Sequence, residues 1–435
     1  MYRLVSLAGI GFFILTAFVF SRDRKKIPWR TVLFGVLLQV LIALFLLQSG
    51  FGRYIFKQIN SLVVEILSHA RAGAELIFGG LAVPPGETGS GGEKSLGFFL
   101  FFQGFPTIIF VASLMAVLYY IRIMPRIVEL FSRIFSKLLK LSGAESLASV
   151  NQIFVGIETV FAIRPYLGKL TNSEMHLLLT AGMATIASSV LAFYTQIMMA
   201  DIPEIGGHLV SASLLSAPAA VIMAKILYPE TGSPETMGKR VQLARNLYDT
   251  EDSDPPAGVL DAAIHGATEG MKLVLGISAM LIAFLGIVSL LNAMVGWGGS
   301  RLGIGGLSFE KILGWIFYPA ALLSGVKPGD VSAISELWGL RLVATEVPAY
   351  FRLADMMKEG LDPRSAVIGA YGLCGFAHVA ALAIFAGGIS TLVPKRRKDL
   401  AKLGVRALFA ATLACFQTAA VAGLCLTAEF QPLIG

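Results

Sequence analysis

Residues 151–167, NQIFVGIETVFAIRPYL, constrain the fold more than any other stretch of this chain. The segment is apolar almost throughout, yet Glu158 lies at its centre and Arg164 and Pro165 lie near its end. A helix that crosses a membrane needs about 20 apolar residues, so this segment is too short to span one. Gly156 and Pro165 also weaken a continuous helix. We therefore expect a broken or re-entrant helix at membrane depth, where only protein or a water-filled cavity can satisfy irregular backbone.

A carboxylate in such a segment costs at least a few kcal/mol, so it marks a solute or ion pathway. The alternative is a helix in a soluble core, with Glu158 paired to Arg164. A second stretch, residues 342–353 (LVATEVPAYFRL), repeats the pattern with Glu346 among apolar neighbours and Pro348 close by. Two interrupted apolar segments, one in each half of a membrane chain, are typical of a transporter site at a repeat interface.

The composition decides against the soluble alternative. Of 435 residues, 55% are hydrophobic and 14% charged, whereas about 25% are charged in soluble proteins. The net charge of +7 does not indicate nucleic-acid binding, because the basic residues cluster in short loops beside apolar runs, as the positive-inside rule describes. The three cysteines lie in apolar segments and imply no disulfide framework. The five histidines are too dispersed for a helical metal pair, and we expect no enzyme.

The apolar pattern predicts an all-α polytopic membrane protein with eight spans and both termini outside. Residues 54–78 are expected to form an amphipathic helix at the membrane interface. The interrupted segments are expected to enter the membrane from opposite sides, at 151–167 from the cytoplasm and at 332–353 from outside. The eight predicted spans are residues 1–20, 31–48, 96–121, 174–199, 209–227, 272–295, 365–392 and 405–427. The seventh is expected to be interrupted by Gly372, Gly375 and His378.

Five sequence strings resemble the concentrative nucleoside transporters in their shorter bacterial form. The strings are SLMAVLYYIRIM, NQIFVGIETVFAIRPYL, EVPAY, YGLCGFAHVAALAIFAGG and VPKRRKDLAKLGVRA, and the likeness covers nearly the whole chain. The resemblance implies a homotrimer in the inner membrane of a bacterium, surrounded by lipid. It further implies two hairpins in an inverted repeat, and a transport domain that moves past a scaffold in an elevator fashion, driven by a cation gradient.

The same resemblance implies a division of the chain into scaffold and transport segments. The scaffold would comprise residues 1–95 and 96–142. The transport domain would comprise residues 143–208, with the first hairpin and fourth span, and residues 332–403, with the second hairpin and seventh span. Residues 209–331 would add the fifth and sixth spans with a cytoplasmic loop at 228–258, and residues 404–435 the last span.

The first hairpin departs from the family at its substrate site. The family reads Gly-Gln-Thr-Glu-Ala-Pro where this chain has Gly156, Ile157, Glu158, Thr159, Val160 and Phe161. Ile157 replaces the amide that would contact a nucleobase, and the carboxylate stands one position earlier. We take Gly156, Ile157, Glu158 and Thr159 as candidate substrate-binding residues.

The second hairpin and the seventh span supply further candidates. Glu346 matches the family glutamate that accepts hydrogen bonds from ribose hydroxyls. Val190 and Phe376 match apolar positions that flank the base, while His378 replaces an asparagine and Ala381 a serine. His378 could instead be a core histidine bonded to a backbone carbonyl.

Two arginines could add charge near this site. If the ligand carries a phosphate, then Arg341, His378 or the positive ends of the hairpin helices could face it. Arg164 and Arg341 could instead stabilise the hairpin ends or pair with Glu158 and Glu346. The sodium site implied by the family falls on Gln152, Val155, Thr185 and Ile186. A proton is the alternative coupling ion, since either glutamate could titrate.

These residues predict a cation-coupled symporter that imports nucleosides or close derivatives, with a nucleotide among the candidates because the site residues are altered. Two other classes remain open. One is a channel or membrane enzyme that keeps a transporter-like scaffold, and the other a transporter of a non-nucleoside polar metabolite such as a nucleobase.

Overall fold

The computed structural model describes residues 2–156, 159–239, 241, 256–301 and 303–426. In this part of the chain the regular structure is helical apart from an isolated bridge between Thr88 and Lys94. Seven described helices or helix pairs are long and apolar enough to cross a membrane. They coincide with seven of the eight predicted spans, and the remaining one, the seventh, is interrupted. The all-α polytopic fold class is thereby confirmed.

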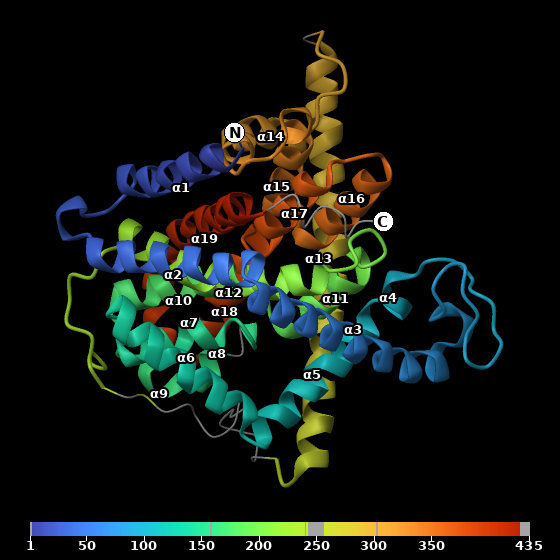
Figure 1. The fold of residues 1–435 in the computed structure, drawn as a ribbon, viewed down its shortest axis with the longest axis horizontal. Coiled ribbons are helices and arrows are strands. Elements are labelled where there is room, and N and C mark those ends of the chain that lie inside the picture. Colours follow the sequence, from blue (N-terminus) through green and yellow to red (C-terminus); the bar gives the residue numbers. More distant parts are fainter. Residues whose placement is uncertain (1, 157–158, 240, 242–255, 302, 427–435) are drawn as a thin grey trace.

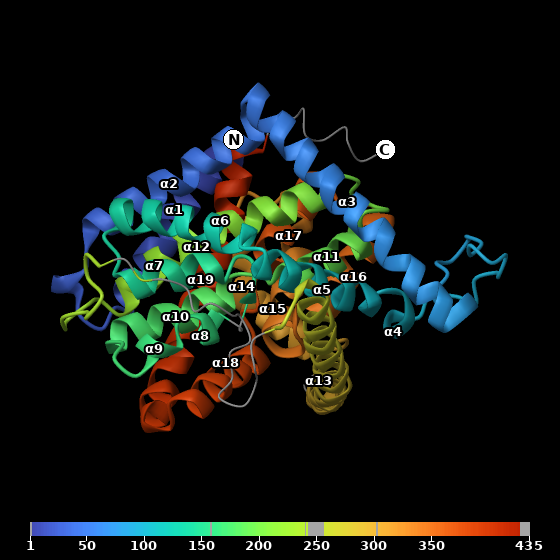
Figure 2. The ribbon, with the colours of Figure 1, turned by 90° about the horizontal axis from the view of Figure 1, so that it is seen from below.

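The peripheral helices are apolar but little buried, as expected of helices that face lipid. In α13 (Val259–Arg301) only 22% of the most apolar window is buried inside the molecule. This helix runs from bottom to top in Figure 1 and is seen nearly end-on at the lower edge of the molecule in Figure 2. The other peripheral spans are α1 (Tyr2–Val19), α2 (Trp29–Gln48) and the pair α4 (Leu100–Gln103) and α5 (Phe105–Tyr120).

Two amphipathic helices join these spans. The predicted interfacial helix is α3, which begins four residues earlier than expected and covers Gly50–Phe78, with the Ser49 side chain accepting from the Gly52 amide as its cap. The second is α6 (Ile123–Leu139), whose buried residues lie three or four apart on one face. Short 3-10 turns lie at Arg24–Lys26, Gly79–Leu81, Pro328–Asp330 and Pro394–Arg396.

The centre of the molecule holds the fourth, fifth and eighth spans. Between 89% and 94% of their apolar windows is buried, so these helices contact protein on every face. They are α10 (Asn172–Ala184) with α11 (Ser188–Met198), α12 (Ile205–Leu227) and α19 (Arg397–Cys425). The break between α10 and α11 was not predicted: Thr185 and Ala187 leave helical geometry in the middle of the fourth span.

The first hairpin is interrupted where the sequence predicts it. It comprises α7 (Gly143–Asn151), α8 (Thr159–Ala162) and α9 (Arg164–Leu167). A capping box between Ser142 and Glu145 starts α7, and the chain leaves the helix after Asn151. Gly156 there adopts φ 77°, a conformation that side chains rarely allow.

The second hairpin and the seventh span are also broken. α14 (Phe309–Leu323) leads into α15 (Val331–Ala344) and α16 (Glu346–Lys358), with Thr345 alone between the last two helices at φ 81°. The seventh span consists of α17 (Pro363–Leu373) and α18 (Val379–Leu392), which confirms its predicted interruption.

The breaks lie against one another. A Cβ added at Gly375, in the seventh-span break, would lie 2.9 Å from the Ala184 carbonyl oxygen, where α10 ends. The Ser188 amide, in the fourth-span break, donates to the Phe154 carbonyl of the first hairpin at 3.1 Å. Backbone groups that a continuous helix would satisfy are therefore gathered in one region of the interior.

Candidate functional site

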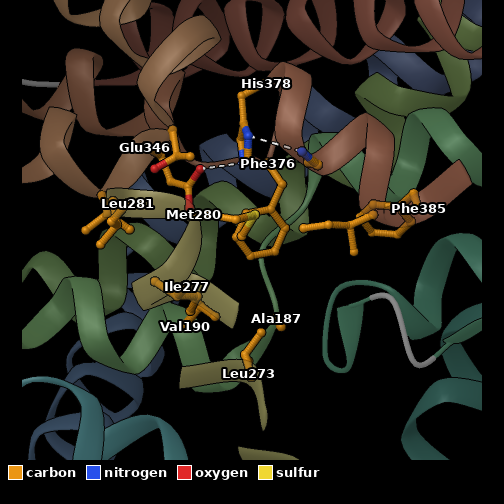
Figure 3. Close-up of a pocket in the computed structure, with 14 residues that line it drawn as sticks. Ala187, Val190, Leu273, Ile277, Met280, Leu281, Glu346, Phe376, His378 and Phe385 are labelled. Carbon is orange, nitrogen blue, oxygen red and sulfur yellow. Dashed lines mark hydrogen bonds and ion pairs between the residues drawn. The ribbon is translucent and has the colours of Figure 1, made fainter. Parts of the chain in front are cut away.

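A pocket with about 670 Å³ of space, including its open part, lies beside these breaks. Figure 3 shows Glu346 and His378 at one end of the pocket and Phe376 near its middle. The walls are almost entirely apolar. They come from α11 and its break (Ala187, Val190), α13 (Leu273, Ile277, Met280, Leu281), the tip of the second hairpin (Thr345, Glu346, Val347) and the seventh span (Phe376, His378, Ala381, Ile384, Phe385).

Glu346 provides the pocket's carboxylate. Its side chain is 4% exposed, and its Oε1 accepts a hydrogen bond from the Tyr194 hydroxyl. Its Oε2 lies 2.9 Å from Nε2 of His378 but accepts no well-aligned hydrogen bond from the described residues. Because Nε2 of His378 is poorly aligned with it, Oε2 keeps acceptor capacity for a donor that enters the pocket.

The helix ends explain how a buried carboxylate is tolerated here. Glu346 is the first residue of α16, and His378 is the cap residue before α18. The amino ends of helices carry partial positive charge, which stabilises a nearby carboxylate. Thr345 turns the chain between α15 and α16 at φ 81°, a strained conformation of the kind found at functional sites.

His378 has a defined orientation. Its Nδ1 accepts a hydrogen bond from the Ala381 amide at 3.2 Å, so this side chain caps α18. An accepting Nδ1 carries no proton, so the ring is the neutral form with its proton on Nε2, the nitrogen 2.9 Å from Glu346 Oε2. His378 thus accepts a hydrogen bond from a backbone amide, whereas the alternative considered from the sequence is a histidine that donates to a backbone carbonyl.

Arg341 is placed away from the pocket. It is fully buried in the last turn of α15, donates from Nη1 to the Gly372 carbonyl near the end of α17, and lies over the Phe416 ring at 5.7 Å. Its charge thus faces the carboxyl ends of two helices, where a cation is favourable. The Glu346 oxygens contact Tyr194 and His378 instead.

Of the other sequence-predicted residues, Val190, Phe376 and Ala381 line the pocket together with Glu346 and His378. Gly156 and Thr159 do not line it; Thr159 is buried in α8, where its hydroxyl accepts from the side-chain Nδ2 of Asn151 at 3.2 Å. Ile157 and Glu158 lie outside the described residues. Arg164 begins α9 and does not line the pocket.

The structure brings Gln152 and Thr185 of the predicted cation site together. The Thr185 hydroxyl lies 3.2 Å from the Gln152 carbonyl oxygen and 2.9 Å from that of Ala181. Gln152 donates from its side chain to the Leu178 carbonyl, while its Oε1 is buried and accepts from no described residue. Oxygen atoms of this kind are the ligands that hard cations prefer. Val155 and Ile186 are buried in the breaks on either side.

Two parts of the site were missed from the sequence. One is the α13 wall, whose pocket-facing residues are Leu273, Ile277, Met280 and Leu281. Their helical spacing does not distinguish them in the sequence, because this span is apolar on all sides. Tyr194 is polar only at its hydroxyl, and its partner is 152 residues away.

Two hairpins, two interrupted spans and a carboxylate at their meeting point define a class of protein. This is the architecture of secondary transporters, whose sites lie where discontinuous helices meet. Three family models match the chain: the Na+ dependent nucleoside transporter N-terminus at residues 8–81, Nucleoside recognition at 101–201 and the Na+ dependent nucleoside transporter C-terminus at 208–423.

Full-length relatives give the same result. An uncharacterized transporter of Haemophilus influenzae is 34% identical, with 98% of each chain covered. The solved structure of CNTnw in an inward-facing substrate-bound state matches with a TM-score of 0.86 at 33% identity, again with 98% of each chain covered. This chain belongs to the concentrative nucleoside transporter family, a family of membrane transporters, as its sequence strings indicate.

Longer animal relatives match over part of their length. Solute carrier family 28 member 3 of Homo sapiens is 35% identical over 437 residues, and Sodium/nucleoside cotransporter 1 of Oryctolagus cuniculus is 32% identical over 438. Each alignment covers 97% of this chain, which spans 60% of the human protein and 63% of the rabbit protein.

Proposed function

We propose that this protein is a sodium-coupled symporter that imports nucleosides. The observation that carries the proposal is the Oε2 atom of Glu346, a buried acceptor without a well-aligned donor in an otherwise apolar pocket. A nucleoside offers hydroxyl donors on its ribose and a flat apolar face on its base. Apolar walls with a few polar groups are the usual lining of a small-molecule site.

The charge of the pocket favours a nucleoside over a nucleotide. Among the described lining residues there is a glutamate and a neutral histidine, and neither lysine nor arginine. A phosphate beside Glu346 would meet a like charge without a counter-ion, which is unfavourable in a buried site. Arg341, one of the two arginines considered from the sequence, donates to the Gly372 carbonyl.

Sodium is the coupling ion that the residues fit. The Gln152 carbonyl, the orphaned Gln152 Oε1 and the Thr185 hydroxyl supply oxygen ligands, and the membrane potential contributes about 2.3 kcal/mol per charge at 100 mV. Occupation of this position would link the first hairpin to the fourth-span break.

The wider arrangement belongs to the same proposal. Residues 143–208 and 332–403 form the mobile transport domain, which moves against residues 1–142. The protein is a homotrimer in a bacterial inner membrane with both termini outside. The support for this is the family membership and the gathering of the breaks in these two segments.

Uptake into proteoliposomes tests the proposal. We expect saturable uridine uptake with sodium that is lost when choline replaces sodium at fixed pH, and no competition by uridine monophosphate. Uptake without saturation would indicate a channel. Uptake that follows a proton gradient in choline would refute sodium coupling, and preference for uracil or the nucleotide would refute the substrate.

Glu346→Gln provides the residue-level test. We expect uridine affinity to fall roughly 10- to 100-fold, since hydrogen bonds to charged groups contribute about 1.5–3 kcal/mol. Glu359→Gln is the matched control, because Glu359 lies just beyond the other end of α16 in an exposed ion pair with Arg352. Equal affinities of the two variants would contradict the placement of the solute.

A further inference from the structure

Tyr194 is held next to the pocket without lining it. Its side chain is fully buried on α11, and its hydroxyl donates to Oε1 of Glu346. Its ring stacks on that of Tyr350, with centroids 4.3 Å apart and planes at 21°. The Tyr350 hydroxyl donates to the Ala370 carbonyl at 3.2 Å, so the second ring is itself anchored to α17.

The two oxygens of Glu346 therefore have different environments. Oε1 is engaged by Tyr194, while Oε2 keeps its acceptor capacity and lies beside His378. The last torsion of a glutamate is broad, so nothing in the side chain itself fixes which way the carboxylate plane turns. The bond from Tyr194 restricts that torsion.

We propose that Tyr194 is a positioning residue that acts through Glu346 and orients Oε2 toward the solute's hydroxyl donors. This inference rests on the proposed function, because it assumes a hydroxyl-bearing solute in the pocket. Tyr194 makes no contact with the solute itself. Removing the Tyr194 hydroxyl is therefore expected to weaken the binding of a solute that donates hydrogen bonds to Glu346, and to have little effect on a solute that does not.

Equilibrium binding to the purified full-length protein in sodium-containing detergent tests this. The ligands are uridine and 2′,3′-dideoxyuridine, which lacks the 2′ and 3′ hydroxyls of the ribose and keeps the 5′ hydroxyl. We expect Tyr194→Phe to weaken uridine binding roughly tenfold and dideoxyuridine binding less than threefold. Tyr350→Phe is the matched control: it removes the other hydroxyl of the same stack and leaves both affinities within threefold of the unmodified protein.

A double-mutant cycle gives a second readout. If Tyr194 acts through Glu346, adding Tyr194→Phe to Glu346→Gln causes no further loss of uridine affinity. Placing 3-fluorotyrosine at position 194 keeps the ring and a stronger hydroxyl donor, so uridine affinity is expected at the unmodified level or above it.

Three results would overturn the inference: equal weakening of both ligands by Tyr194→Phe, additive losses in the cycle, or loss of uridine binding with the fluorinated residue. A failure of the proposed function looks different. In that case the unmodified protein would bind uridine and dideoxyuridine equally or not at all.

Discussion

Glu75 shows how a single side chain fastens a loop at the membrane interface. It lies near the end of the amphipathic α3, and its Oε2 accepts from both the hydroxyl and the amide of Ser90, at 2.6 and 2.9 Å. Arg71 pairs with its other oxygen. The hydrogen bonds from Ser90 and the neighbouring Arg71 lower the pKa of Glu75 to about 2. The loop that follows α3 is thus attached through an ionised carboxylate.

This pKa predicts the pH dependence of the attachment. Because the pKa in the folded protein is lowered, the contribution is present above the ordinary glutamate pKa and is lost only as the pH falls toward 2. Peptides covering residues 79–99 should stay protected from hydrogen exchange, corrected for the intrinsic rate, from pH 7 down to pH 4. Glu75→Gln should raise exchange roughly tenfold across this range. Loss of protection in the unmodified protein near pH 5 would disprove the lowered pKa.

At the scale of elements, close packing holds the interrupted seventh span against the second hairpin. Gly372 lies in the last turn of α17, where an added Cβ would meet the Trp338 ring of α15 at 2.4 Å. Trp338 is fully buried and stacks on Phe416, with ring centroids 4.6 Å apart. Gly387, in the other half of the same span, has no atom within 4 Å of the Cβ position.

We therefore expect opposite effects from one methyl group in the two halves. Gly372→Ala should destabilise the protein by about 1–3 kcal/mol through overpacking. Gly387→Ala should leave stability unchanged or raise it by up to about 1 kcal/mol, since alanine favours helix. Melting temperatures of the purified proteins compare the two. Equal shifts would show that the Gly372 contact does not hold the span.

At the scale of the whole molecule, α5 forms hydrogen bonds with the fourth span and with the first hairpin. Both belong to residues 143–208 of the proposed transport domain. Near its start, the Thr107 hydroxyl donates to the Gln196 side chain of α11 at 2.7 Å. Near its end, the Tyr119 hydroxyl donates to Asn151, the last residue of α7. A domain that slides past α5 must break both contacts.

Cross-linking the first contact should therefore stop transport. In a Thr107→Cys, Gln196→Cys protein, a short thiol cross-linker is expected to abolish uridine uptake and preserve uridine binding, with a reducible linker restoring uptake after reduction. The native cysteines described here are buried, which keeps the reaction at the introduced pair. Undiminished uptake by fully cross-linked protein would refute the sliding motion. Each single-cysteine variant treated in the same way is the control.

Much of the fold could be predicted from the sequence. The eight spans, the hairpin at 151–167 and the break in the seventh span follow from long apolar runs, isolated charges and glycine or proline, which act locally in hydrocarbon. The sequence also singles out Glu346 as a candidate site residue, because a carboxylate among apolar residues at membrane depth is costly. The family follows from the sequence strings.

Other features were decided only by the tertiary structure. The fourth-span break has no glycine or proline in it, and the α13 wall cannot be distinguished from a lipid-facing stripe by its pattern. The partners of Tyr194 and Arg341, which are Glu346 and Gly372, lie 152 and 31 residues away in the chain. In a chain that is apolar nearly everywhere, periodicity does not tell protein-facing from lipid-facing sides. Packing between distant segments decides which polar groups meet.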